Sequence, residues 1–224
     1  MLTKVSYTID DFLKFKQRLG ELGGFEFAHG LIWDKEAGKP VDEAIIEQIL
    51  ADDFDIDKFD FTQPFLTMPT QKHDRVVSNL LRILMSLLNG DDYFVYSQKT
   101  GVIRENDELG SFREPDVVVV ETTKEQRNKY HKVENPCVVI EVLSKSTQRI
   151  DLGEKVLDYQ ELASVKSYLI VWQNKMQVVI YNRLDEKRWE EIIYDQAEQN
   201  ILVPSLGIEI PMQEIYQKVD LNNA

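Results

Sequence analysis

The spacing of apolar residues along the chain changes between helical and extended periods. Apolar side chains recur at steps of three and four over 9–19 and again over 73–89, which predicts two amphipathic helices. The buried face of the second helix is made up of His73, Val76, Val77, Leu80, Leu84 and Leu87. Shorter helices are expected over 42–51 and over 151–163, the last opened by Asp151 and Glu154 as a capping box.

Strands are predicted where short apolar runs lie between turn residues. They are expected at 25–27, 31–33, 93–97, 101–104, 116–121, 137–143, 167–172, 176–182 and 188–194. The first two form a hairpin in this prediction, and so do the next two. The runs 116–121 and 137–143 are apolar at almost every position, which is typical of strands buried on both faces. Helices and strands in this order predict an α/β protein.

The length and composition are those of a chain with a large hydrophobic core. The 224 residues are 43% apolar. We expect a core over 64–224, with a helical and hairpin extension over 1–63 packed on it. No stretch has roughly 18 uninterrupted apolar residues and no secretory signal is present, so a cytoplasmic protein without membrane contact is expected. The single cysteine, Cys137, begins an apolar strand and is expected to be buried.

The charge of the chain is strongly acidic but unevenly distributed. A net charge of −13 argues against simple polyanion binding, because phosphate contacts need Lys and Arg. Residues 1–63 carry 7 basic and 14 acidic side chains, and residues 184–224 carry 3 and 9. The remaining middle segment is neutral, with 16 of each sign. Within it, 122–155 has seven basic residues against five acidic ones, which leaves nucleic-acid binding open.

Two carboxylates on consecutive predicted strands carry the candidate chemistry. Asp116 begins one strand, and Glu141 lies near the end of the next. Mg²⁺ prefers oxygen ligands and usually takes one or two protein carboxylates. A bound ion would lower the pKa of a water molecule and neutralise charge on a scissile phosphate. Asp116 could instead simply start a strand after Pro115, whereas Glu141 within an apolar strand costs several kcal/mol unless it is paired or bound to metal.

A lysine close to these carboxylates would orient the attacking water or stabilise the developing charge. Lys155 and Tyr159 share the inward face of the helix predicted over 151–163, which favours Lys155. Lys145 is the rival, and Lys155 could also serve only to pair with Asp151. Tyr159 is better explained as a packing residue with a polar tip than as a catalyst.

Four strings of residues, in this order, resemble a known family. They are Met68-Pro69-Thr70-Gln71-Lys72-His73, Glu114-Pro115-Asp116-Val117-Val118-Val119, Val139-Ile140-Glu141-Val142-Leu143-Ser144-Lys145-Ser146-Thr147, and Asp151-Leu152-Gly153-Glu154-Lys155 with Tyr159. Over about residues 24–183 the chain is similar to the Uma-type family of putative restriction endonucleases, in the PD-(D/E)XK nuclease superfamily. The resemblance implies a restriction-endonuclease-like α/β fold, with a mixed central sheet flanked by helices.

The resemblance also implies a metal site that holds Mg²⁺ or Mn²⁺. Its ligands would be Asp116, Glu141, the carbonyl of Val142 and His73 on the preceding helix. His73 could equally be a buried, hydrogen-bonded residue at a helix start. DNA would be the substrate.

The superfamily lysine two residues after the glutamate is replaced here by Leu143. By resemblance, the lysine comes from the following helix, so the catalytic residues would be Asp116, Glu141 and Lys155. Lys145, Arg149 and Tyr159 are candidate substrate-binding residues.

The expected function is therefore a magnesium-dependent endodeoxyribonuclease, a hydrolase acting as a homodimer because cutting two strands favours paired active sites. One alternative is a catalytically inactive nuclease fold that binds nucleic acid or a protein partner, and another is an interaction subunit whose acidic ends recruit a partner. Replacing Asp116 or Glu141 with alanine is expected to abolish cleavage and to leave the metal-free fold as stable or more stable, because two like charges no longer repel.

Overall fold

The computed structural model describes residues 6–20, 24–35, 37–59, 70–97, 100–104, 110–129, 131–143 and 152–221. The chain divides into two units. Unit 1 is Met1–Met68 with Ile103–Glu114, and unit 2 is Pro69–Val102 with Pro115–Ala224. The border predicted between residues 63 and 64 lies in 60–69, outside the described residues.

The described residues form an α/β protein, as the sequence predicts. The helices are α1 (Ile9–Leu19), α2 (Glu43–Leu50), α3 (Gln71–Leu87), α5 (Glu154–Glu161) and α6 (Met212–Ile215), with 3-10 turns η1 (Ile56–Lys58) and η2 (Thr122–Lys124). The strands are β1 (Phe25–Ala28), β2 (Leu31–Asp34), β3 (Lys39–Pro40), β4 (Tyr93–Ser97), β5 (Val102–Arg104), β6 (Ser111–Arg113), β7 (Val117–Glu121), β8 (Val138–Leu143), β9 (Ser167–Trp172), β10 (Val178–Arg183), β11 (Trp189–Tyr194), β12 (Asn200–Val203) and β13 (Ile208–Pro211). None of these helices is long and apolar enough to cross a membrane.

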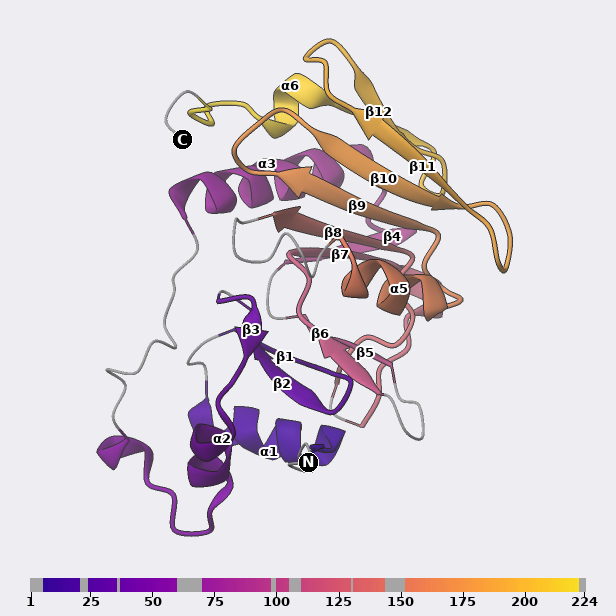
Figure 1. Ribbon diagram of the computed structural model, residues 1–224. Helices are drawn as coiled ribbons and strands as arrows, with labels where there is room; N and C mark the ends of the chain where they lie inside the picture. The colour runs from indigo at the N-terminus through magenta and orange to yellow at the C-terminus, as the bar shows by residue number, and fades with distance from the viewer. Residues whose placement is uncertain are drawn as a thin grey trace. The chain divides into compact units, whose positions relative to one another are not determined.

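Unit 1 is built on a five-stranded sheet in the order β3-β2-β1-β6-β5, with α1 and α2 beside it (Figure 1). Its core is mainly aromatic, with Phe12 of α1 packed against Phe27 and Phe112 at ring-centroid distances of 5.7 and 4.9 Å. α1 begins as a capping box, because Thr8 Oγ1 accepts from the backbone N–H of Asp11 while the Asp11 carboxylate accepts from that of Thr8. The predicted hairpin of β1 and β2 is confirmed.

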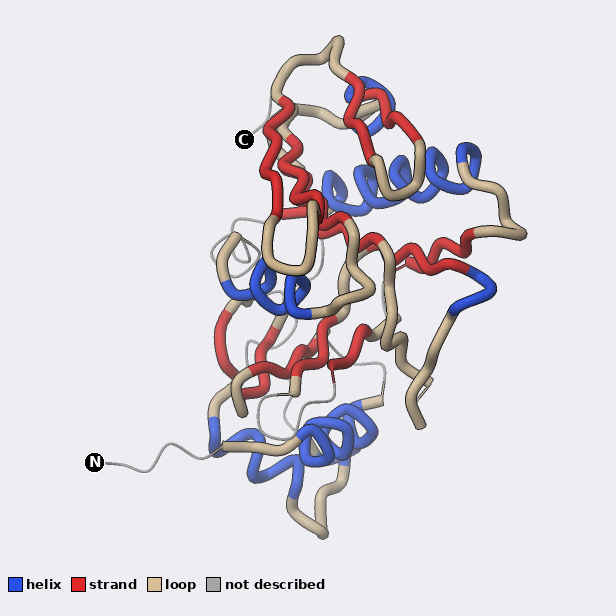
Figure 2. Tube along the Cα trace, turned by 90° about the vertical axis from the view of Figure 1, so that its right-hand side faces the viewer, coloured by secondary structure: helices blue, strands red, loops and turns tan. Residues whose placement is uncertain are grey.

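Unit 2 is built on a six-stranded mixed sheet in the order β11-β10-β9-β8-β7-β4. β8 and β9 are parallel, and the other neighbouring pairs are antiparallel. Helices α3 and α5 lie on opposite sides of this sheet (Figures 1 and 2). The predicted mixed sheet flanked by helices is therefore present in this unit.

The neighbouring strands β7 and β8 of unit 2 divide their apolar residues between the helices on the two sides of the sheet. Successive strand residues point to opposite faces. Val119 of β7 and Ile140 of β8 pack in one cluster with Leu80 of α3, whereas Val118 packs in another with Tyr159 of α5. Both strands are thus buried on both faces, as their unbroken apolar runs predict.

Two details of the predicted elements are wrong, and a third falls partly outside the described residues. Segments 93–97 and 101–104 form no hairpin, because β4 pairs along its whole length with β7, while β5 joins the sheet of unit 1. Leu87 does not belong to the buried face of α3, since it is 45% exposed at the helix end. The predicted capping box falls on Asp151, which lies outside the described residues, and α5 begins at Glu154 after Gly153 at the N-cap.

Cys137 is buried, as predicted, and its thiol donates to the Val119 carbonyl at 3.2 Å. Burial raises the pKa of the Cys137 thiol to about 12. Because only the thiolate is a good nucleophile, Cys137 is a structural residue.

The C-terminal end of α5 is held by a side chain from β10. The Arg183 guanidinium donates to the carbonyls of Gln160 and Leu162 at 2.7 and 2.9 Å and to that of Val165 at 2.7 Å. It also lies over the Trp189 ring, with Cζ 4.2 Å from the centroid. The last carbonyls of a helix have no partner within the helix, so these bonds satisfy groups that need an external donor.

Replacing Arg183 with alanine should lower the free energy of unfolding by about 2–4 kcal/mol. The change removes the hydrogen bonds that this charged donor makes to three carbonyls near the end of α5, together with the contact with Trp189. Arg188→Ala is the matched control, since Arg188 is exposed and pairs only across a turn with Asp185; it should change stability by about 0.5 kcal/mol or less. Urea denaturation followed by circular dichroism measures both. Equal losses for the two variants would contradict this role of Arg183.

Candidate active site

The two candidate carboxylates lie opposite each other at one end of strands β7 and β8. Val117 pairs with Ile140 in the antiparallel register, so one further step places Asp116 opposite Glu141. Directly opposed residues of an antiparallel pair point to the same face, with Cβ atoms about 4.5–5.5 Å apart. Both residues are 1% exposed. The sheet thus brings together two acidic residues that are 25 positions apart in the sequence.

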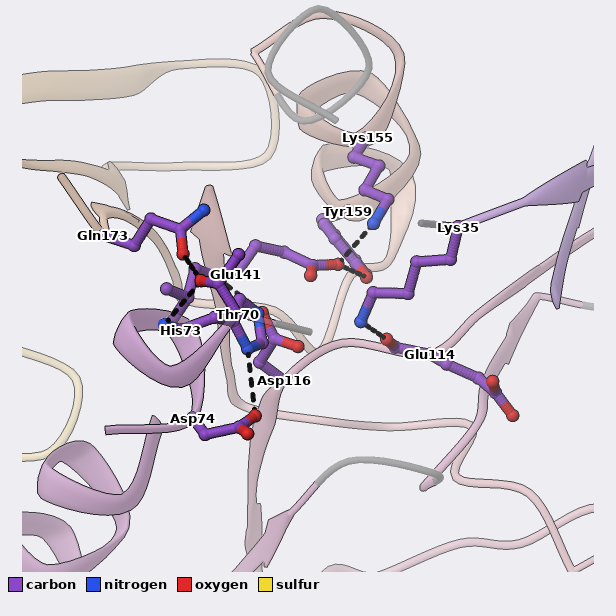
Figure 3. Close-up of polar contacts among 11 residues, drawn as sticks. Lys35, Thr70, His73, Asp74, Glu114, Asp116, Glu141, Lys155, Tyr159 and Gln173 are labelled. Atoms are coloured by element: carbon purple, nitrogen blue, oxygen red, sulfur yellow. Dashed lines mark hydrogen bonds and ion pairs between the residues drawn. The ribbon is translucent and has the colours of Figure 1, made fainter. Parts of the chain in front are cut away.

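Asp116 is held by a backbone donor and by a histidine. Its Oδ2 accepts from the backbone N–H of Val142 at 2.7 Å and lies 3.2 Å from His73 Nε2 (Figure 3). The other ring nitrogen of His73, Nδ1, lies 3.8 Å from Asp74 Oδ1. His73 is in the first turn of α3 and is 7% exposed, so this histidine is both buried and in contact with a predicted ligand.

Glu141 is held by the two polar side chains that α5 directs inward. Its Oε1 accepts from Lys155 Nζ at 2.8 Å and from the Tyr159 hydroxyl at 3.2 Å (Figure 3). Lys155 and Tyr159 are each 1% exposed. The expected contact between Lys155 and one of the two carboxylates is therefore present. Lys155 has a buried partner in Glu141, so an ion pair with Asp151 is not needed to explain its position.

The local fold explains why α5 can deliver these groups. Lys155 and Tyr159 are four residues apart and share one helix face. That face packs on the side of the sheet where Val139 and Leu143 point, and Glu141 lies between them in the strand alternation. The Tyr159 ring also contacts Tyr168 at 4.8 Å between centroids, so its hydroxyl is placed by packing. Tyr159 is a packing residue with a polar tip, as expected.

The Lys155–Glu141 ion pair changes one expectation about stability. Removing one partner of a buried ion pair leaves an uncompensated buried charge, which costs roughly 3–5 kcal/mol. Glu141→Ala would leave Lys155 in that position. We therefore expect Glu141→Ala to lower the stability of the metal-free fold instead of preserving it, because Lys155 would lose its buried partner.

The donors at this end of the sheet suit a divalent cation with oxygen ligands. Two buried carboxylates and one ammonium leave a formal charge of −1. Hard cations such as Mg²⁺ and Mn²⁺ bind carboxylate and carbonyl oxygens, and Mg²⁺ usually takes only one or two carboxylates. In the part of the chain that the structure describes, no three His, Cys, Asp or Glu side chains are grouped so that they could hold a metal ion together. The candidate ligands among the described side chains are therefore the two carboxylates, and His73 contacts Asp116.

Two of the predicted substrate-binding residues have no described position, and one predicted ligand is untested. Lys145 and Arg149 lie in 144–151, outside the described residues. The Val142 carbonyl as a ligand stays a prediction, although the Val142 N–H already contacts Asp116. Leu143, which replaces the superfamily lysine, is 3% exposed and packs in the core.

The sequence prediction assigns no role at the site to two polar residues, Thr70 and Gln173. Thr70 caps α3 by accepting from the His73 N–H at 3.2 Å, and its hydroxyl also donates to Gln173 Oε1. Gln173 follows β9, which is parallel to β8. Parallel neighbours end at the same edge of a sheet, so a polar residue directly after β9 is a signal that could have pointed to Gln173.

Comparison with known proteins identifies the family of this chain and a solved structure of similar fold. Two uncharacterized proteins of Synechocystis sp. are similar in sequence. The first is 29% identical over 103 residues, which cover 46% of this chain and 53% of that protein. The second is 28% identical over 130 residues, which cover 56% of this chain and 72% of that protein. The match thus spans about half the length of the first relative. The crystal structure of a putative nuclease belonging to DUF820 from Anabaena variabilis is similar in fold, with a TM-score of 0.62 and 15% identity over 93% of this chain and 97% of that one.

The family comparison covers most of unit 2. Residues 62–213 match the model of the Uma2 family, described as "Putative restriction endonuclease". The family expected from the four sequence strings is confirmed. Because the match extends over more than half of the chain, this protein belongs to the Uma2 family of putative restriction endonucleases.

Proposed function

We propose that the protein is a metal-dependent endonuclease that hydrolyses phosphodiester bonds in DNA. One observation carries the proposal: Asp116, directly before β7, lies opposite Glu141 of β8, and Glu141 accepts from Lys155 at 2.8 Å. Membership of the Uma2 family supports the same chemistry.

The cation in this proposal is Mg²⁺ or Mn²⁺, held by Asp116, Glu141 and the Val142 carbonyl. When bound, it would neutralise charge on the scissile phosphate and lower the pKa of a water molecule. Asp116 is prepared for this task because the Val142 N–H and His73 already fix its Oδ2. His73 as a further ligand stays a prediction.

Lys155 is the proposed third catalytic residue. Its ammonium orients the attacking water or stabilises the negative charge that develops on the phosphate. Glu141 and the rigid packing of α5 hold Lys155 in place, so little reorganisation is needed during the reaction. Lys155 thereby replaces the lysine that Leu143 cannot provide.

The proposal also includes contacts with DNA and a homodimeric assembly. Lys145, Arg149 and Tyr159 are proposed to contact DNA, although the Tyr159 hydroxyl already contacts Glu141 in the protein alone. The net charge of −13 disfavours tight non-specific binding. A bound cation would add positive charge near the site. A homodimer stays a prediction.

The alternative is a nuclease fold without catalysis that binds nucleic acid or a protein partner. Leu143 at the lysine position and the acidic charge favour it. The buried ammonium of Lys155 on Glu141 favours the enzyme, because an inactive module has no need of a buried charge beside two carboxylates.

Asp116→Asn and Glu141→Gln should each reduce cleavage to below roughly 1% of the wild-type rate, because each removes a charged ligand while keeping an oxygen acceptor of similar shape. Conversion of supercoiled plasmid DNA in Mg²⁺ and in Mn²⁺ measures the rate, and circular dichroism checks the fold. Asp185→Asn is the control, since Asp185 is an exposed residue of a distant turn. Wild-type rates in Glu141→Gln would show that the assigned site is wrong, and no cleavage by wild type in either metal would favour the inactive module.

The two lysines should differ in what they contribute. Lys155→Met should lose most of the single-turnover rate, because the ammonium on Glu141 is gone while the apolar stem is retained. Lys145→Ala should mainly weaken DNA affinity and reduce its salt dependence by about one phosphate contact. Lys166→Ala, whose ammonium is exposed and contacts the Ala163 carbonyl, is the matched control. The reverse ranking would transfer the catalytic role to Lys145.

A further inference from the structure

A chain of hydrogen bonds links the end of β9 to Asp116 through the first turn of α3. Gln173 Oε1 accepts from the Thr70 hydroxyl, Thr70 Oγ1 accepts from the His73 N–H at 3.2 Å, and His73 Nε2 lies 3.2 Å from Asp116 Oδ2 (Figure 3). The chain ends on β8, where the Val142 N–H donates to the same Oδ2 at 2.7 Å.

Three of the four side chains in this hydrogen-bond chain are buried, whereas Thr70 is exposed. Gln173 and His73 are each 7% exposed, and Asp116 is 1% exposed. Buried polar side chains cost free energy unless they are hydrogen-bonded, so Gln173 in this position calls for a partner. That partner is the residue that caps the helix carrying His73.

The hydroxyl of Thr70 is the central link. It accepts from the His73 N–H as an N-cap, and it uses its single proton on Gln173. Thr70 is thereby held in one rotamer by two elements, which fixes the backbone position from which the His73 ring extends. The ring position in turn decides how it meets Asp116.

We propose that Gln173 and Thr70 are positioning residues that act as one unit to orient His73 on Asp116. Residues that support a metal-ligating carboxylate or histidine typically change metal affinity by about 10–100-fold when removed. Gln173 and Thr70 touch neither the reacting atoms nor the cation in this account. Their effect passes through His73. The Mn²⁺ part of the test rests on the proposed function, whereas the ring orientation of His73 does not.

Gln173→Met is the main test variant, because it removes the amide acceptor, keeps the length of the side chain and leaves the Thr70 cap in place. Thr70→Val removes the hydroxyl, and Thr70→Ser restores it. Asn174→Met is the matched control, since Asn174 is the exposed neighbour of Gln173. Urea denaturation identifies any variant that does not fold.

The first measurement is the His73 ring C–H resonance in the metal-free protein at one pH, assigned by its absence in His73→Gln. It should move in Gln173→Met and in Thr70→Val, and the double variant should show no larger displacement than either single variant, because both break the same link. Thr70→Ser and Asn174→Met should keep the wild-type position. An unchanged resonance in a folded Gln173→Met protein would overturn the proposal.

The second measurement is the Mn²⁺ affinity by calorimetry. Gln173→Met and Thr70→Val should each weaken binding about tenfold, again without addition in the double variant. Additive losses would mean that the two residues act separately and would overturn their action as one unit. If the wild-type protein binds no Mn²⁺, the proposed function fails, and the ring resonance alone decides the role of Gln173 and Thr70.

Discussion

The buried ion pair between Lys155 and Glu141 is the interaction on which the rest of this site depends. A carboxylate within a strand that is buried along its whole length is unfavourable unless a partner compensates it. Lys155 is the partner, at 2.8 Å, and α5 must therefore pack with this face toward the sheet. Arg183 secures the other end of the same short helix, so a helix of 8 residues is fixed at both ends.

The register of β7 and β8 is the second constraint. A shift of one residue would turn either Asp116 or Glu141 toward the α3 side of the sheet and separate the two carboxylates. Apolar residues on both faces of both strands oppose such a shift, because the two clusters differ in their residues and in the helices they contact. Core packing thereby determines the geometry of the polar end. Asp116 can then be reached by His73 from the opposite side, since it lies before the first residue of β7.

Elements with strong periodicity could be predicted from the sequence, and so could the contact of Lys155 with a strand carboxylate. The helices α1 and α3, the apolar strands β7 and β8 and the inward direction of Lys155 follow from patterns that tertiary structure reinforces. The pairing of β4 could not be predicted, because β4 does not pair with β5, the next strand along the chain. It pairs instead with β7 over its whole length. The pair β12 and β13 was not predicted from the sequence. Thr70 and Gln173 are common polar residue types, and only the parallel arrangement of β8 and β9 brings Gln173 to the site.

In this arrangement, different elements of unit 2 provide different groups at the site. The two carboxylates proposed as ligands come from the ends of the strands, α5 supplies the ammonium, and α3 contacts Asp116 through His73. Residues that are catalytic in the proposal are thus supported by elements whose own stability comes from the apolar core.

The central claim is that Asp116 and Glu141 share one divalent cation. A crystal of the protein soaked in Mn²⁺ and measured at a wavelength where manganese scatters anomalously tests it most directly. The account predicts one anomalous peak at this end of the sheet, with oxygens of both carboxylates about 2.0–2.6 Å away. A peak bound by only one of them, or no peak at this position in crystals that hold Mn²⁺ elsewhere, would contradict it.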